Sequence, residues 1–498
     1  MSAPDDWLVL RNAASAALAD VPRHAFERLA ALVLEAVSRG ERVCALLGWP
    51  RASGGAEILA VTAADEAGLL RAAIGSVPGR AFPSLTPECP QVHLFERELA
   101  ETLGLEPLGH PWQKPVRFAR RDGASPTVGV MDYYRVEGEE VHEVAVGPVH
   151  AGVIEPGHFR FQCHGEEVLH LEISLGYQHR GVERALVEGD PRRRLHYAET
   201  LAGDTSIGHA LAYAQALEAL SGASPSPRAE ALRGIALELE RLANHTGDLG
   251  ALAGDVGFLP TAAFCGRLRG DWLNLTAMIC GSRFGRGLVR PGGVGFDVEP
   301  ARAERMRELV DATLRDVASA ADLLWTSPSV MARFEDTGVL SARDATELGL
   351  VGPVARACGL ARDVRSSFPC GIYRFAQIPR ASWHSGDVFA RAYLRWIEIQ
   401  RSASFVREEL AQLPTGPLRT PCAALAPERF CISLVEGWRG EICHVLRTDA
   451  AGGISGYKVV DPSFHNWTGL AMALRGQPIS DFPLCNKSFN LSYCGFDL

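Results

Sequence analysis

The segment from Asp461 to Asn466 has the spacing of a metal-binding motif without its usual ligands. Ser463 and Asn466 are three residues apart and directly follow Asp461-Pro462, as the two thiolates do in a DPCxxC pair. Two cysteines at this spacing can reach one soft transition metal. Here a hydroxyl and an amide stand where the two sulfur atoms would be.

The cysteines elsewhere in the chain do not supply a replacement pair. None of the twelve cysteines forms a CxxC motif, although zinc and iron–sulfur sites usually show such short spacings. We therefore expect most of them to be reduced, buried thiols that pack as small hydrophobic residues.

Composition excludes several classes of protein. The chain has 498 residues, 47% of them hydrophobic, which predicts a folded protein of about two to four domains. A net charge of −9 argues against nucleic acid as the main partner. No apolar run approaches the ~18–20 residues that cross a bilayer, and the acidic N-terminus does not resemble a signal peptide. These features predict a cytoplasmic protein, which can still attach to a membrane complex.

Residues 1–122 are predicted to form a small α/β domain. Helical spacing of apolar residues predicts helices over 24–39 and 65–74, and apolar runs separated by a glycine-rich turn predict strands over 43–49 and 57–62. The segment 93–103 has the pattern of an amphipathic helix ended by Gly104, with His110 in a following Gly-His-Pro turn.

Residues 123–140 are polar and lack periodicity, so they are predicted to be a linker. Residues 141–498 then form the second domain. It is expected to contain a β-hairpin around His164-Gly165-Glu166, a second hairpin from residue 435 to 457, and mostly helices between them. Ser385 or Asp387 can cap one of those helices. The predicted fold class is α+β.

Three motifs in order then indicate a family. They are Gly147-Pro148-Val149-His150, the EPGHFR run from Glu155 to Arg160, and the segment from Tyr177 to Glu183. They resemble motifs of the large subunit of energy-converting, membrane-bound nickel–iron hydrogenases (group 4), which is similar to the quinone-facing large subunit of respiratory complex I. The run from His93 to Pro111 resembles the neighbouring small α/β subunit of complex I. The chain thus looks like a fusion of the two.

The resemblance also identifies what this chain lacks. The four thiolates of a nickel–iron site would fall at Ala202, Thr205, Ser463 and Asn466, and none is cysteine. The tyrosine that holds the quinone headgroup in complex I would fall at Gly203. The resemblance therefore implies that no metal and no cofactor is bound by this chain, and that hydrogenase activity is lost.

The same resemblance implies partners and a cleft. The partners would be a small subunit carrying an iron–sulfur cluster and antiporter-like membrane subunits, on the cytoplasmic face of the cell membrane. The cleft would lie between residues 147–160, the Ala202–Thr205 turn and the Asp461–Asn466 segment. Its candidate residues for quinone or another acceptor are His150, His158, His179, Arg180, Glu183, Gly203, Asp204 and His465.

Two functions remain open from the sequence. The chain could be a working redox subunit that passes electrons from the partner cluster to quinone or another acceptor. It could also be a catalytically silent scaffold, since buried ion pairs would explain the same polar residues. Glu240, Arg241 and His245 match a family motif and are interpreted first as satisfied polar groups in a helical bundle, and second as proton carriers. A hard-metal site at Thr205, Ser463, His465 and Asn466 is a weaker alternative.

Overall fold

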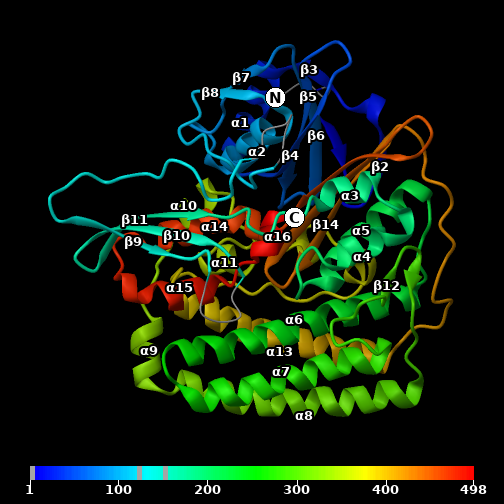
Figure 1. Cartoon of the computed structure of the whole chain (residues 1–498). Coiled ribbons are helices and arrows are strands. Elements are labelled where there is room, and N and C mark those ends of the chain that lie inside the picture. Colours follow the sequence, from blue (N-terminus) through cyan, green and yellow to red (C-terminus); the bar gives the residue numbers. More distant parts are fainter. Residues whose placement is uncertain (1–5, 120–125, 150–154) are drawn as a thin grey trace.

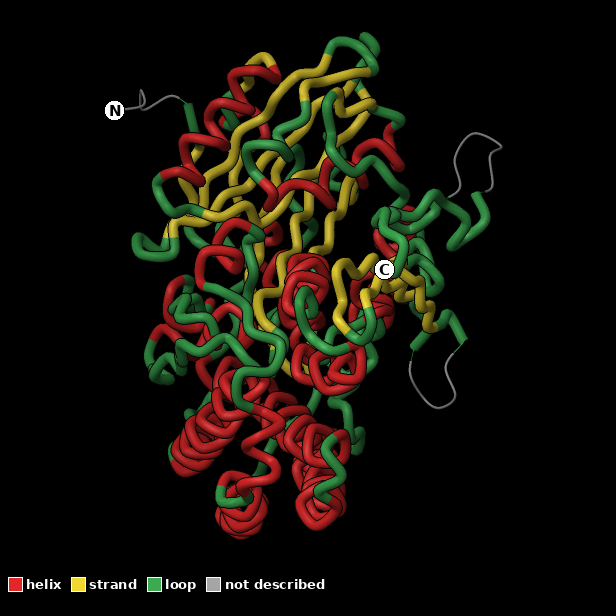
Figure 2. The backbone as a smooth tube through the Cα atoms, turned by 90° about the vertical axis from the view of Figure 1, so that its left-hand side faces the viewer, coloured by secondary structure: helices red, strands yellow, loops and turns green. Residues whose placement is uncertain are grey.

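The computed structural model of the chain describes residues 6–119, 126–149 and 155–498. Helices and strands are both abundant, in agreement with the expected α+β class. A sheet-containing N-terminal part lies above a layer of long helices, and smaller sheets and short helices lie between them (Figure 1). The view turned by 90° separates strands and long helices in the same way (Figure 2).

The N-terminal part folds around a sheet with the order β1-β6-β5-β4, to which β3 adds in parallel beside β6. Its strands are β1 (Leu8–Leu10), β3 (Arg23–Ala25), β4 (Arg42–Pro50), β5 (Ala56–Ala64) and β6 (Leu69–Val77). Helix α1 (Phe26–Ser38) packs its apolar face on this sheet. Helix α2 (His93–Leu103) ends at Gly104, whose φ of +66° is readily adopted by glycine. Short strands β7 (Ala81–Pro83) and β8 (Glu106–Leu108) pair in parallel.

The helix predicted over 65–74 is wrong. Residues 65–68 form a turn, and β6 pairs along its whole length with β5, with Ala73 opposite Ala60. Strand β6 also pairs with β1 and β3, so its backbone is satisfied by neighbouring strands. A short apolar run does not distinguish a strand from a helix by itself, and here the sheet context decides.

Two further sheets lie between the N-terminal part and the long helices. One consists of β9 (Val141–Val146), β10 (His158–His164) and β11 (Glu167–Ser174), which includes the predicted hairpin. The other has the order β16-β15-β14-β2, with β2 (Ser15–Ala17), β14 (Arg429–Gly437), β15 (Gly440–Thr448) and β16 (Ile454–Val460). The second predicted hairpin is thereby confirmed and extended by a third consecutive strand.

Strand β2 joins the early chain to the late chain. It pairs with β14 over residues 15–17 and 429–431. Just before it, the buried side chain of Asn12 donates to Phe368 O and Leu434 O and accepts from Leu434 N. The expected boundaries at residues 122 and 140 remain predictions.

The helical layer is built from α6 (Pro227–Asp255), α7 (Leu259–Cys280), α8 (Pro300–Trp325) and α13 (Val388–Ala411). Asp387 caps α13 by accepting a hydrogen bond from Ala390 N, which decides between the two predicted caps. Short elements connect this layer to the sheets: α9 (Pro328–Phe334), α10 (Ala342–Glu347), α11 (Gly352–Ala357), α12 (Val364–Ser367), β12 (Val289–Arg290) and β13 (Gly293–Val294).

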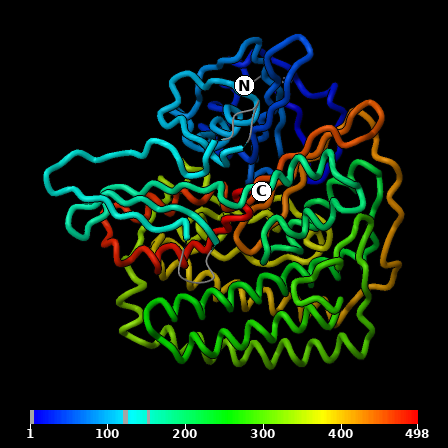
Figure 3. The backbone as a smooth tube through the Cα atoms, in the orientation of Figure 1, coloured from blue at the N-terminus to red at the C-terminus, as the bar shows by residue number. Residues whose placement is uncertain are grey.

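The remaining helices surround the predicted cleft. They are α3 (Val182–Glu188), α4 (Arg194–Glu199), α5 (Ser206–Ser221), α14 (Pro462–Ala473), α15 (Phe482–Phe489) and α16 (Tyr493–Asp497). The backbone tube shows the end of the chain running between the N-terminal part and the helical layer (Figure 3).

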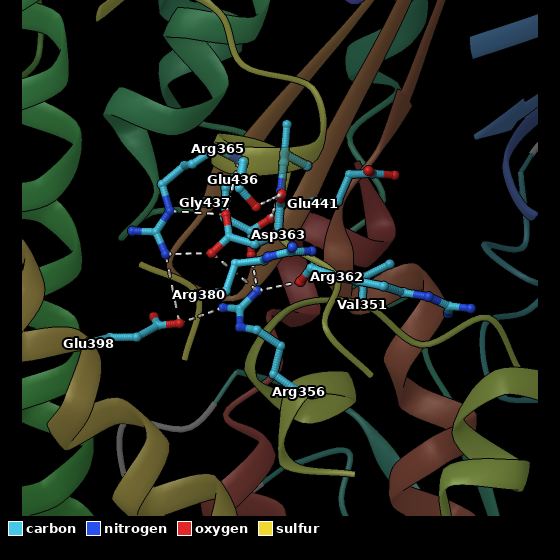
Figure 4. A network of polar contacts seen from close by, with 12 residues as sticks. Val351, Arg356, Arg362, Asp363, Arg365, Arg380, Glu398, Glu436, Gly437 and Glu441 are labelled. Carbon is cyan, nitrogen blue, oxygen red and sulfur yellow. Dashed lines mark hydrogen bonds and ion pairs between the residues drawn. The ribbon is translucent and has the colours of Figure 1, made fainter. Parts of the chain in front are cut away.

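A buried charge cluster ties the helical layer to the β14–β15 hairpin. Arg356 binds Glu398 at 2.6 Å and Glu436 at 2.7 Å, and it approaches Asp363 at 3.8 Å (Figure 4). The cluster consists of three arginines and four carboxylates, namely Arg241, Arg356, Arg365, Glu238, Asp363, Glu398 and Glu436. Buried charges of opposite sign must be paired, and this arrangement pairs them across α6, α11, α12, α13 and β14.

All twelve cysteines are free thiols, and all but Cys280, Cys422 and Cys494 are buried. The prediction that most cysteines are buried is therefore confirmed.

Candidate functional site

The turn from Ala202 to Thr205 connects α4 to α5. Ala202 is buried and has no side-chain donor, and Thr205 lies just before the first residue of α5. The Thr205 hydroxyl donates to Asp204 and accepts from Trp438 Nε1 at 3.1 Å and from Arg439 at 3.3 Å. The two positions of this turn where the resemblance predicts missing ligands are thus an apolar side chain and a hydroxyl that is hydrogen-bonded within the protein.

Asp204 and Arg439 form the principal ion pair beside this turn. Arg439 binds both carboxylate oxygens of Asp204, at 2.6 Å and 2.8 Å. Burial alone would raise the pKa of Asp204, but the attraction of Arg439 outweighs it and the pKa is lowered. Asp204 is therefore ionised and fixed in position.

Ser463 and Asn466 are at the start of α14 and are also satisfied by the protein. Ser463 Oγ accepts from Ser492 N at 2.8 Å. The Asn466 amide accepts from Val351 N and donates to Val351 O, both at 3.1 Å. This pair of bonds uses the amide as a bridge to the loop before α11.

These donor atoms do not fit a nickel–iron centre. Such a centre needs four soft thiolates, and the four positions offer a methyl group, two hydroxyls and an amide. Within the described ranges, no group of three or more histidine, cysteine, aspartate or glutamate side chains is placed to hold a metal ion.

Residues 492–497 fill the space where the three predicted segments meet. Tyr493 N donates to Glu155 Oε2 at 3.3 Å, on the side of residues 147–160. Gly495 packs so closely on the Asp461 carboxyl group that a Cβ atom there would lie 2.7 Å from it. The three segments that were expected to border a cleft are thus close together, but residues 492–497 pack between them.

Three of the predicted cleft residues hold neighbouring backbone segments. Arg180 donates to the carbonyl oxygens of Thr200, Leu201 and Cys494. His179 Nδ1 lies 2.8 Å from Asp497 O. Glu183 accepts from Val459 N and pairs with Lys458 at 3.1 Å. Their contacts fix the turn, the end of the chain and β16 relative to one another.

The other predicted cleft residues are dispersed. Gly203 is exposed, with open space where a side chain would be. His158 Nδ1 contacts Gly147 O at 3.1 Å, and its Nε2 is buried without a partner. His465 packs against Phe95, and burial lowers its pKa to about 3. His150 lies outside the described residues.

The structure adds a buried hydrogen-bond chain that the sequence did not indicate. Asp461 Oδ2 lies 3.1 Å from His209 Nε2, and His209 Nδ1 lies 3.1 Å from His444 Nε2. His444 Nδ1 lies 2.8 Å from the hydroxyl of Tyr457. All four side chains are buried. We call them the His209–His444 relay.

One set of tautomers satisfies the whole relay. If His209 Nε2 donates to Asp461, then His209 Nδ1 accepts from His444 Nε2, and His444 Nδ1 accepts from Tyr457. Burial and the neighbouring His209 lower the pKa of His444 well below its usual value, so its ring is neutral. The arrangement can pass protons along its length. Positions 209 and 444 are far apart in the sequence, and no spacing rule connects them.

Glu240 adds a second protonatable group behind the turn. It accepts from Ile207 N and Gly208 N in the first turn of α5. Burial raises its pKa to about 8, although these two N–H groups act in the opposite direction. Arg241 and His245 of the same motif instead bind Glu238 and Glu398. The interpretation as satisfied polar groups is supported for Arg241, whereas the Nδ1 atom of His245 is buried without a hydrogen-bond partner.

Comparison with known proteins agrees with the motifs. The family model described as respiratory-chain NADH dehydrogenase, 49 Kd subunit, matches residues 255–429. The carbon monoxide-induced hydrogenase of Rhodospirillum rubrum is 32% identical over 352 residues, which are 70% of this chain and 97% of that protein.

Two other relatives span both branches of the resemblance. Formate hydrogenlyase subunit 5 of Escherichia coli is 29% identical over 437 residues, covering 83% of this chain and 76% of that protein. NADH-quinone oxidoreductase subunit 4 of Thermus thermophilus is 30% identical over 371 residues, which cover 69% of this chain and 90% of that protein.

Among the described residues, no helix has the length and apolar character that a membrane span requires. The motifs, the fold and the extent of these matches lead to one assignment: the chain belongs to the oxidoreductase family that comprises the large subunits of energy-converting hydrogenases and the 49 kDa subunit of respiratory complex I.

Proposed function

We propose that this chain is an electron-transfer subunit of a membrane-associated, complex I-like oxidoreductase. It passes electrons from a partner iron–sulfur subunit to quinone or another organic acceptor, without a nickel–iron site of its own. Its partners in this complex are the iron–sulfur subunit and antiporter-like membrane subunits. The chain lies on the cytoplasmic face of the membrane.

The His209–His444 relay is the observation that carries the proposal. Reduction of a quinone consumes two electrons and two protons, so an acceptor site needs a local proton supply. The relay begins at Asp461, two residues before Ser463, and each of its side chains is hydrogen-bonded to the next as far as Tyr457. A purely structural core would more simply use apolar residues at these four buried positions.

The surroundings of Gly203 also support an acceptor at this place. Gly203 is exposed and leaves open space, and the adjacent Asp204–Arg439 pair is only partly covered. A partner subunit docked over this turn would complete an enclosed site. The acceptor would then be held by polar groups other than the tyrosine used in complex I.

The scaffold remains the second candidate, and one observation favours it. The side chains of His179, Arg180 and Glu183 form hydrogen bonds with backbone groups of this chain. They are therefore explained without any substrate.

A measurement on the purified complex separates the two. Nickel, iron and acid-labile sulfide would be quantified, the partner clusters reduced, and their reoxidation by decylubiquinone followed by electron paramagnetic resonance. We expect no nickel and reoxidised clusters. Stoichiometric nickel would contradict the absence of a metal site, and clusters that decylubiquinone leaves reduced would favour the scaffold.

The relay itself is tested by Tyr457→Phe, which removes one hydroxyl and keeps the ring. We expect unchanged cluster content and a reoxidation rate that is reduced by about tenfold or more. This reduction is somewhat smaller than the lowest rate contribution that is typical of a general acid or base. Tyr213→Phe is the matched control, because Tyr213 stacks on Tyr457 with ring centroids 6.4 Å apart and is not part of the relay. Equal rates in both variants would remove the relay from the proposal.

A further inference from the structure

A cavity of about 450 Å³ lies where the N-terminal part meets the rest of the chain. It is bordered by α2, the loop over residues 110–116, β11 and α14. Its wall is largely apolar, and its volume is in the range of sites that bind small organic molecules. None of the lost-ligand positions lines it, and neither does the Asp204–Arg439 pair.

In the described part of this wall, three buried polar atoms have no hydrogen-bond partner: one ring nitrogen each of His170 and Trp467, and the hydroxyl of Ser174. His170 and Trp467 both line the cavity and are at most 6% exposed. The Nε2 atom of His170 and the Nε1 atom of Trp467 have no hydrogen-bond partner. Unpaired buried polar groups are rare because each costs about 1–3 kcal/mol, so they point to a missing ligand. The indole N–H can only donate, which requires an acceptor on that ligand.

The free charge of the wall is positive. Arg97 and Arg475 line the cavity, and neither has an ion-pair partner among the described residues. Arg97 donates only to the carbonyl oxygens of Lys114 and Pro115. The one lining carboxylate, Glu172, is already bound by Lys114 Nζ at 2.6 Å and by Tyr134 N at 2.7 Å.

An aromatic stack shapes one side of the cavity. The His170 ring lies 5.4 Å from the ring of Trp112 and 4.7 Å from that of Tyr134. A flat or extended apolar body could pack beside Trp112, which itself lines the cavity.

We propose that this cavity binds a small amphipathic anion, with an apolar body in the cavity and a carboxylate, sulfonate or phosphate group near Arg97 and Arg475. The binding site joins the two parts of the chain, because its wall combines α2 of the N-terminal part with α14. It is independent of the acceptor proposed above.

Binding is tested with a matched pair of fluorescent probes on the purified chain or its complex. 8-Anilinonaphthalene-1-sulfonate carries the anionic group, and N-phenyl-1-naphthylamine is its uncharged analogue. We expect saturable binding of the sulfonate at one site per chain, with competition by decanoate and weaker competition by decanol. A sulfonate that binds without saturation, or that decanol displaces as well as decanoate does, would overturn the proposal.

Two variants locate the site. Ala471→Phe fills the cavity from α14 and should abolish binding of both probes. Arg475→Met removes an exposed charge. It should lower the binding affinity for the sulfonate about fivefold and leave the affinity for the uncharged probe unchanged. Arg305→Met is the control, because Arg305 is exposed on α8 and distant from the cavity lining. Melting temperatures of all variants are compared first, so that a folding defect is recognised. Unchanged affinities in both cavity variants would contradict the site.

Discussion

At the scale of single residues, Glu240 combines a structural contact with an altered proton affinity. Its carboxyl group caps the first turn of α5, and burial raises its pKa to about 8. In the unfolded chain this group loses its proton near the ordinary value of 4.5. The folded state therefore binds the proton more tightly than the unfolded state does.

This difference predicts a pH dependence of stability. The contribution of Glu240 is fully present below pH 4.5 and is lost as the pH rises toward 8, by ~1.4 kcal/mol per pH unit. Glu240→Gln should remove this slope, so melting temperatures of wild type and variant should diverge in favour of the variant between pH 5.5 and 8. Glu188→Gln, at an exposed carboxylate of α3, should follow the wild type. Parallel profiles for wild type and Glu240→Gln would show that the pKa is not raised.

Asn466, at one of the positions where the resemblance predicts a missing thiolate, forms a structural hydrogen-bond bridge. Asn466→Ala leaves Val351 N without its hydrogen-bond partner and removes the side-chain bond to Val351 O. We expect a loss of about 3 kcal/mol in the free energy of unfolding, measured by urea denaturation. Thr468→Ala, a partly buried position two residues further along α14, is the comparison. A cost for Asn466→Ala no larger than that for Thr468→Ala would mean that the bridge to Val351 contributes little.

At the scale of elements, much of the architecture could be predicted. Both hairpins, α1, α2 and the long helices have apolar residues at the period of their structure, and Gly104 and Asp387 mark ends that the sequence already indicates. Strand β6 was missed because its assignment depends on the strands beside it. The relay could not be predicted at all, because His209 and His444 meet only when α5 packs on β15.

Arg180 connects three elements through backbone carbonyl groups, and this predicts a local effect. Arg180→Lys keeps the charge but cannot reproduce the planar arrangement that reaches Thr200, Leu201 and Cys494. We expect faster amide hydrogen exchange in residues 199–204 and 492–497, with little change in α7 and α8. Arg192→Lys is the control, since Arg192 binds only the neighbouring Asp190. Unaltered exchange in both segments would show that Arg180 is not needed to hold them.

At the scale of the whole molecule, the buried charge cluster joins the helical layer to the sheet that contains β14 and β15. Arg356 binds the carboxylates of both Glu398 in α13 and Glu436 in β14. Arg356→Met leaves these carboxylates without their shared partner, and we expect a loss of about 3–5 kcal/mol in the free energy of unfolding. Arg343→Met breaks an exposed pair with Glu347 and should cost less than ~1 kcal/mol in the same denaturation experiment. Similar costs for the two variants would show that burial adds little to this pair.

The pairing of β2 with β14 has a consequence for synthesis on the ribosome. Residues 15–17 hydrogen-bond to residues 429–431, and Asn12 binds the backbone at Phe368 and Leu434. Residues 15–17 of β2 emerge from the ribosome long before their partner strand, which is translated more than four hundred residues later. The nascent chain must therefore keep an unpaired strand available throughout elongation, which exposes it to premature association and makes it a natural client for ribosome-bound chaperones.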